Sequence, residues 1–201
     1  MKLGVLVSGS GTNLQAILDA KALGELGGAE VAVVVSNRPG VGALARAEAA
    51  GVPALVIDHR GFPTRALFED ELLAALSRHG VELVALAGFM RVLTPHFLRA
   101  YPDRVVNIHP ALLPAFPGVD AQKQALDYGV KITGVTVHFV DEGTDTGPVI
   151  AQIPVPVLDD DTIESLRARI LSHEHALYPR VLAALAEGRV TKRGRRVHVR
   201  P

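Results

Sequence analysis

Short apolar runs alternate with longer segments that carry a single apolar stripe through the first half of the chain. Runs of strand length lie at 3–7, 31–35, 53–57 and 82–88. Helices are predicted between them at 12–20, 42–50 and 65–78, the last with a stripe of Leu67, Phe68, Leu72, Leu73 and Leu76. Strands that are apolar on both faces and joined by helices indicate a parallel sheet covered on both sides.

The pattern changes in the second half. A strand at 104–108 runs into a proline-rich loop, and a short helix follows at 120–128. Segments 131–140 and 148–157 predict an antiparallel strand pair. A long helix is predicted over 162–187, capped by Asp161 or Thr162. The basic tail is interpreted as a short exposed hairpin, and an anion-binding tail is the alternative. The predicted fold class is α/β, with a doubly wound, mostly parallel sheet, an antiparallel C-terminal strand pair and a long C-terminal helix.

Composition and charge exclude several classes of protein. The chain has 201 residues, enough for one domain or for two halves sharing a core, and its 21 Lys and Arg balance 21 Asp and Glu. That balance argues against binding to nucleic acid through bulk charge. No apolar run reaches the roughly 18 residues of a membrane span, and the first run is interpreted as a buried strand, not a signal peptide. The absence of cysteine excludes disulfides and thiolate chemistry, so a cytoplasmic location is expected.

The glycine-rich stretch VSGSGTNLQ at 7–15 directly follows the first strand. A turn from strand to helix presents free backbone N–H groups and the positive end of the helix dipole, which together favour an anion. Leu14 stands where a dinucleotide loop needs a third glycine, and the second strand ends in Ser36-Asn37-Arg38 without an acid for a ribose. No Gly-Lys-Ser/Thr follows either. The loop therefore predicts a site for a single terminal phosphate, and a turn without a ligand is the alternative.

The second candidate motif, VVNIHPALLP, places Asn107 and His109 two residues apart at a strand end. This spacing puts both side chains on one face of the strand, at the edge where open sheets bind ligands. An amide there can donate to a developing oxyanion, and an imidazole can transfer a proton.

A third candidate segment, HFVDEGTDTGPVI, carries Asp141, Glu142 and Asp145 in a loop between two strands. A carboxylate close to His109 would orient the imidazole and raise its pKa. The alternative for this loop is a solvated hairpin.

These motifs, with LAGFMRVLTP at 86–95 and HEHALYP at 173–179, occur in the order and spacing of one known family. Nearly the whole chain resembles the folate-dependent phosphoribosylglycinamide formyltransferases. The resemblance implies a Rossmann-like formyltransferase domain over 1–201, with a nucleotide- and phosphate-binding half at 1–100 and a folate-binding, catalytic half at 101–201. It also implies formyl transfer from 10-formyltetrahydrofolate, as cosubstrate, to the amine of 5-phosphoribosylglycinamide in purine biosynthesis.

The resemblance also implies residue roles. The catalytic group would be Asn107, His109 and Asp145. The ribonucleotide would bind to Gly11, Thr12 and Asn13 through its phosphate and to Glu174 through its glycinamide end. The folate would contact Arg65, Met90, Arg91, Val92, Leu93, Asn107, His138, Asp141 and Glu142. Gln122 and Leu171 depart from residues common in the family, which affects peripheral contacts only.

The implied partners are these small molecules, with no metal, nucleic acid or membrane and with a monomeric or homodimeric state. The main alternative is a 10-formyltetrahydrofolate hydrolase. Formylation of methionyl-tRNA, a nicotinamide-dependent oxidoreductase and a non-catalytic nucleotide-binding module are further alternatives. The missing third glycine and ribose acid disfavour the oxidoreductase, and a binding module would not require the catalytic group.

Overall fold

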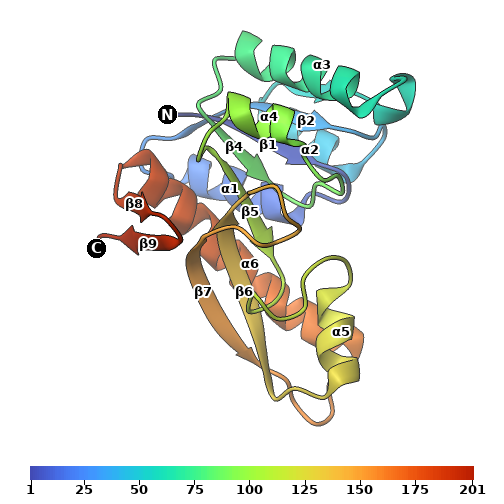
Figure 1. Cartoon of the computed structure of the whole chain (residues 1–201), viewed down its shortest axis with the longest axis vertical. Coiled ribbons are helices and arrows are strands. Elements are labelled where there is room, and N and C mark those ends of the chain that lie inside the picture. The colour runs from blue at the N-terminus through green and yellow to red at the C-terminus, as the bar shows by residue number, and fades with distance from the viewer.

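The computed structural model describes residues 1–201, and its centre is a seven-stranded sheet with helices on both faces (Figure 1). The strand order is β3-β2-β1-β4-β5-β6-β7, with bounds β1 Lys2–Val7, β2 Glu30–Ser36, β3 Ala54–Val56, β4 Leu83–Leu86, β5 Val105–His109, β6 Ile132–Phe139 and β7 Val149–Pro156. Strands β1 to β5 pair in parallel, whereas β6 is antiparallel to both β5 and β7. The predicted fold class is confirmed, and the β5–β6 pairing adds a second antiparallel neighbour.

Six α-helices cover the sheet, with bounds α1 Thr12–Ala22, α2 Gly42–Ala49, α3 Arg65–Arg78, α4 Pro95–Ala100, α5 Ala121–Tyr128 and α6 Ile163–Ala186. Alternate residues of β1 point to opposite faces, so Val5 packs with α1, α2 and α6 while Leu6 packs with α3 and α4. Both layers are apolar, which explains why the strand sequences show no polar alternation. No helix combines the length and hydropathy needed to cross a membrane.

Helix α6 is fixed to the centre of the sheet by Tyr178. This side chain is fully buried, and its hydroxyl oxygen lies 3.0 Å from the carbonyl oxygen of Leu86 and 3.1 Å from that of Val106. Thr162 is the N-cap of α6 and forms a capping box with Ser165, which satisfies the backbone N–H groups of both residues. Of the two predicted caps, Thr162 is therefore correct.

Two short elements were not predicted, namely α4 and the 3-10 turn η1 (His59–Gly61). Each spans less than two helical turns, too short for an apolar stripe to show. The basic tail does form a hairpin, from β8 (Val190–Arg193) and β9 (Arg196–Val199).

The carboxyl ends of β1, β4 and β5 lie at one edge of the sheet, because these strands are parallel neighbours. The chain leaves β1 toward β2 on one side and leaves β4 toward β5 on the other. This reversal makes the edge a topological switch point, where open α/β sheets bind ligands. The loops that begin at residues 8, 87 and 110 all start from this edge.

Candidate active site

The glycine-rich loop has the backbone that an anion site requires. Gly11 has φ of +76°, and a Cβ there would lie 2.6 Å from the Cβ of Ala43 on α2. Only glycine combines this conformation with this close approach. Helix α1 starts directly after it, so the first N–H groups of the helix, from Thr12 and Asn13, have no partner within the helix.

Arg46 of α2 supports this loop and was missed by the sequence analysis. Its Nε donates to the carbonyl oxygen of Ser10 at 2.9 Å, and its Nη1 donates to the Oε1 of Gln15 at 3.0 Å. The guanidinium therefore fixes the loop and adds positive charge beside it. No motif marks this residue, because the contact joins a side chain to a backbone carbonyl of another element.

Asn13, in the first turn of α1, contacts Glu174 of α6, although the two residues are far apart in the sequence. The Nδ2 of Asn13 donates to the Oε2 of Glu174 at 3.1 Å, and the carboxyl group is buried. Burial raises the pKa of Glu174 to about 7, and the hydrogen bond from Asn13 only partly opposes this. The Oδ1 of Asn13 is buried without a partner. The structure thus brings together Asn13 and Glu174, two of the residues expected to bind the ribonucleotide.

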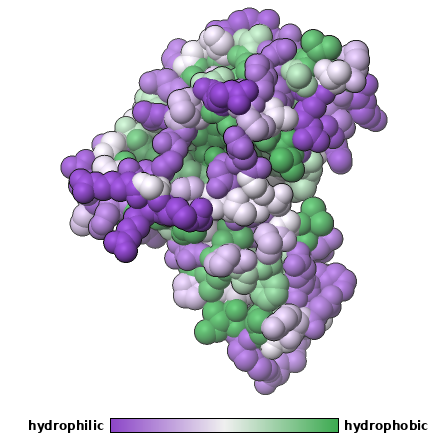
Figure 2. Space-filling model, in the orientation of Figure 1, coloured by the Kyte–Doolittle hydropathy of each residue, from purple (hydrophilic) through white to green (hydrophobic).

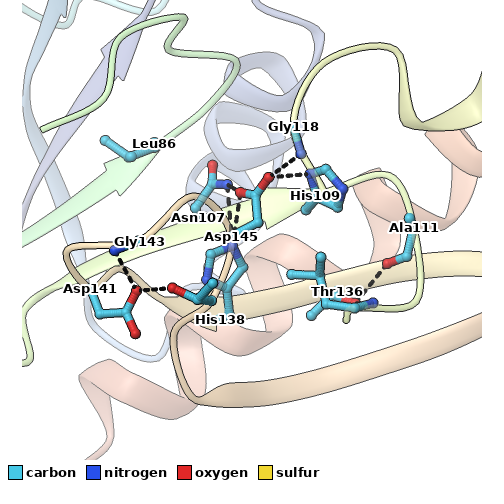
Figure 3. A network of polar contacts seen from close by, with 12 residues as sticks. Leu86, Asn107, His109, Ala111, Gly118, Thr136, His138, Asp141, Gly143 and Asp145 are labelled. Carbon is cyan, nitrogen blue, oxygen red and sulfur yellow. Dashed lines mark hydrogen bonds and ion pairs between the residues drawn. The ribbon is translucent and has the colours of Figure 1, made fainter. Parts of the chain in front are cut away.

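Asn107, His109 and Asp145 converge at the end of β5 (Figure 3). The Nδ1 of His109 lies 3.3 Å from the Oδ2 of Asp145. The Nδ2 of Asn107 lies 3.5 Å from the Oδ1 of the same carboxylate. An amide, an imidazole and a carboxylate therefore share one small volume, although Asp145 comes from the loop after β6.

The second ring nitrogen of His109 is also engaged. Its Nε2 donates to the carbonyl oxygen of Phe116 at 2.8 Å. The pKa of His109 is lowered, because burial disfavours the imidazolium more than the Phe116 carbonyl and the Asp145 charge favour it. The charge of Asp145 acts on the pKa of His109 in the predicted direction, but burial, which the sequence does not reveal, outweighs it.

Asp145 is held as an anion by several donors. Burial alone would raise its pKa, but the nearby His138 side chain, the N–H of Gly118 and the charges of the two histidines together lower it. The Gly118 N–H is 2.8 Å from Oδ2, and the Nε2 of His138 is 3.6 Å from Oδ1. His138, which was expected only among the residues that contact the folate, therefore also lies beside the Asp145 carboxylate. Gly118 was missed, since a backbone donor leaves no mark in a residue pattern.

A cavity of about 620 Å³ opens beside these three side chains. Its walls come from the loop after β4, the end of β5, the proline-rich loop and the loop after β6. The expected folate residues in its lining are Met90, Arg91, Val92, Leu93, Asn107, His138 and Asp141. Arg65 and Glu142 are exposed and lie outside that lining. Gln122, one of the departures from the family, lines the cavity, as do Val119 and Asp120.

Asp141 also organises its own loop. Its Oδ1 accepts hydrogen bonds from the Gly143 N–H at 3.2 Å and from the Thr146 hydroxyl at 2.6 Å. The side chain therefore fixes the turn that carries Asp145.

Comparison with known proteins agrees with this architecture. Residues 1–182 match the formyl transferase family. The phosphoribosylglycinamide formyltransferase of Bacillus subtilis is 43% identical over 184 residues, which are 92% of this chain and 94% of that protein. A crystal structure of glycinamide ribonucleotide transformylase 1 from Symbiobacterium toebii has a TM-score of 0.97 at 52% identity, covering 99% of this chain and 93% of that one.

The chain also resembles part of a larger protein. The trifunctional purine biosynthetic protein adenosine-3 of Drosophila melanogaster is 51% identical over 93% of this chain, but the chain spans only 14% of that protein.

A doubly wound sheet whose switch point holds a buried imidazole–carboxylate pair, together with the family match, defines a formyl transferase. Within that class the chain belongs to the phosphoribosylglycinamide formyltransferase family of purine biosynthesis. The resemblance stated from the motifs is confirmed, as is the expectation of a formyltransferase enzyme. The oxidoreductase and the non-catalytic binding module are thereby set aside.

Proposed function

We propose that the chain transfers a formyl group from N10 of 10-formyltetrahydrofolate to the primary amine of 5-phosphoribosylglycinamide, giving formylglycinamide ribonucleotide. The observation that carries this proposal is the convergence of Asn107, His109 and Asp145 beside a cavity of about 620 Å³. A phosphate-type loop lies at the same edge of the sheet. Both reactants can thus reach one imidazole.

The ribonucleotide would bind at the first turn of α1. The N–H groups of Thr12 and Asn13, with the dipole of α1, suit a terminal phosphate. Glu174 contacts Asn13 and lies on α6, so it would receive the glycinamide portion.

The folate would occupy the cavity, with its ring system between the loop after β4 and the loop after β6. Met90 is 62% exposed, Val92 is 52% exposed and Val119 is 76% exposed. These apolar side chains surround a cavity whose inner end is polar, an arrangement that suits a flat ring carrying hydrogen-bonding edges. We assign Arg65 and Glu142 to peripheral contacts with the folate, because both lie outside the lining.

We propose one domain over 1–201, since a single apolar core joins residues of β1, β5 and α6. Within it, residues 1–100 would bind the nucleotide and its phosphate, and residues 101–201 would bind folate and carry the catalytic group. Residues 90–93 belong to the first half and still line the folate cavity, so the two halves share that site. A monomer or homodimer remains our prediction.

In the proposed reaction the amine lone pair attacks the formyl carbon, and the carbonyl electron pair moves onto oxygen. Asn107 and the protonated form of His109 would donate hydrogen bonds to this oxyanion. Collapse re-forms the carbonyl and breaks the bond to N10, and the proton released by the amine ends on N10. The protonated His109 would give its proton to N10 as that bond breaks and then take up the proton from the amine, so that the net transfer is from the amine to N10 and the ring ends as it began. Asp145 would stabilise the charged ring. Because Nε2 is bonded to the Phe116 carbonyl, a reactant that uses this nitrogen must replace that carbonyl.

A spectrophotometric assay with a 10-formyl folate analogue tests the function. Deformylated folate should form only when 5-phosphoribosylglycinamide is present, in a one-to-one ratio with the formylated ribonucleotide. The alternative hydrolase would release deformylated folate and formate without the ribonucleotide. No deformylated folate in either condition would reject both functions.

A further inference from the structure

The C-terminal hairpin β8–β9 lies outside the region matched to the family, which ends at residue 182. It forms a strongly hydrophilic part of the surface (Figure 2). Segment 189–200 contains no acidic residue, and its cations are Arg189, Lys192, Arg193, Arg195, Arg196 and Arg200. This segment is not part of the seven-stranded sheet and contributes no residue to the proposed reaction.

The hairpin contacts the loop that carries Asp145. Arg195, in the turn between the two strands, donates from Nη2 to the carbonyl oxygen of Thr146 at 2.8 Å. Lys192 pairs with Asp103 and lies 5.8 Å from the centre of the Phe139 ring. The hairpin is therefore fixed to the body of the protein on one side and to the catalytic loop on the other.

That loop holds Asp145 in an unfavourable conformation. The φ of Asp145 is +54°, a left-handed value that costs a non-glycine residue conformational energy. Asp141 restrains the loop from inside through Gly143 and Thr146. At its far end, a Cβ on Gly147 would lie 1.8 Å from the Phe139 carbonyl oxygen, so the backbone there is tightly packed. The Thr146 carbonyl lies between these restraints, and Arg195 is the side chain that binds it.

We propose that Arg195 is a positioning residue that keeps the loop 141–147 in place, so that Asp145 retains its contacts with His109 and Gly118. The effect of Arg195 on kcat rests on the proposed formyl transfer. Loosening the loop lets Asp145 leave the left-handed conformation, and the imidazole then loses part of the charge that favours its protonated form.

The hairpin offers matched controls. Arg193 and Arg196 are exposed on the same two strands, and neither hydrogen-bonds to the loop. Arg193→Ala and Arg196→Ala therefore remove the same charge as Arg195→Ala without removing the contact. Arg195→Lys keeps the positive charge and N–H donors, and one donor is enough for a single carbonyl.

Kinetics give the first test. Arg195→Ala should lower kcat by about three- to tenfold, the range expected from losing one hydrogen bond that holds a catalytic group. Arg195→Lys should recover most of that loss, while the two control variants keep the wild-type rate. Equal losses in all three alanine variants would overturn the proposal in favour of general attraction of anionic substrates, and a wild-type rate for Arg195→Ala would overturn it outright.

An NMR titration of His109 gives a second test that needs no turnover. The Asp145 charge raises the pKa of His109, so Arg195→Ala should lower that pKa, whereas Arg193→Ala and Arg195→Lys should leave it in place. Because the titration uses the free protein, it tests Arg195 even if formyl transfer itself is disproved. An unchanged His109 titration in Arg195→Ala would contradict the proposal.

Discussion

The Nδ1 of His109 and the Oδ2 of Asp145 lie 3.3 Å apart, while the Nε2 of the same ring lies 2.8 Å from the Phe116 carbonyl oxygen. Both ring nitrogens therefore face acceptors. Only the imidazolium can donate to both, yet burial lowers the pKa of His109. The two acceptors favour the charged ring, whereas desolvation, the larger of the two effects, favours the neutral ring.

Replacing His109 by Ala should lower kcat by about 10²–10⁴, the usual contribution of a positioned acid or base. The fold should survive, because Ile108 and Val106 keep β5 in the sheet. Steady-state rates and a thermal melt check both parts. A near-native rate would remove His109 from the reaction.

Asp145→Asn should lower the pKa of His109 further, because the Asp145 charge is one of the causes that raise it. The part of the pH–rate profile that reports on His109 should then move to lower pH, and kcat should fall. Asp141→Asn is a useful comparison, since it alters the loop and not the carboxylate beside the ring. An identical profile in Asp145→Asn and wild type would mean that the two side chains are not coupled.

Glu174→Gln should change how stability depends on pH. The pKa of Glu174 is raised from 4.5 to about 7 in the folded protein, so between these values the folded state binds a proton that the unfolded state has lost. The free energy of unfolding should therefore fall as pH rises through this window, by roughly 3 kcal/mol at most. The Gln variant should lack that decline. Urea titrations at pH 5 and pH 8 compare the two, and a wild type equally stable at both pH values would contradict the raised pKa.

Gly11→Ala should weaken ribonucleotide binding more than folate binding. The new Cβ would clash with Ala43 and force the φ of +76° on a residue that resists it. Gly9→Ala should have a smaller effect, because no atom lies within 4 Å of a Cβ there. Separate KM values for the two substrates measure the difference. A larger rise in the folate KM than in the ribonucleotide KM would place the phosphate elsewhere.

Sequence patterns predicted the elements that carry a long apolar stripe. Helix α3 occupies 65–78 as expected, because its stripe spans several turns and Thr64 caps its start. Helix α4 has six residues and a proline at its first turn, too little for a stripe to show. The pairing of β6 with β5 could not be deduced either, because strand order depends on packing between distant segments.

In the candidate site, too, some residues are visible in the sequence and others are not. Asn107, His109 and Asp145 have side chains of catalytic type in short motifs, so the sequence reveals them. Gly118 and Phe116 act through backbone groups, and those groups are the same in every residue. The direction in which the pKa of His109 shifts could not be predicted, because the largest cause is burial, and burial is a property of the folded protein.

Tyr178 and Glu174 are one helical turn apart on α6, and the Tyr178 hydroxyl reaches the carbonyls of β4 and β5. The strand carrying Asn107 and the helix carrying Glu174 are thus joined by a buried contact that touches neither reactant. In the proposed reaction, this contact would set the distance between the ribonucleotide amine and the formyl carbon during folding, and hence the effective concentration of one at the other. Tyr178→Phe removes only the two hydrogen bonds to the Leu86 and Val106 carbonyls, so it should lower kcat, measured at saturating concentrations of both substrates, by widening the range of distances between them.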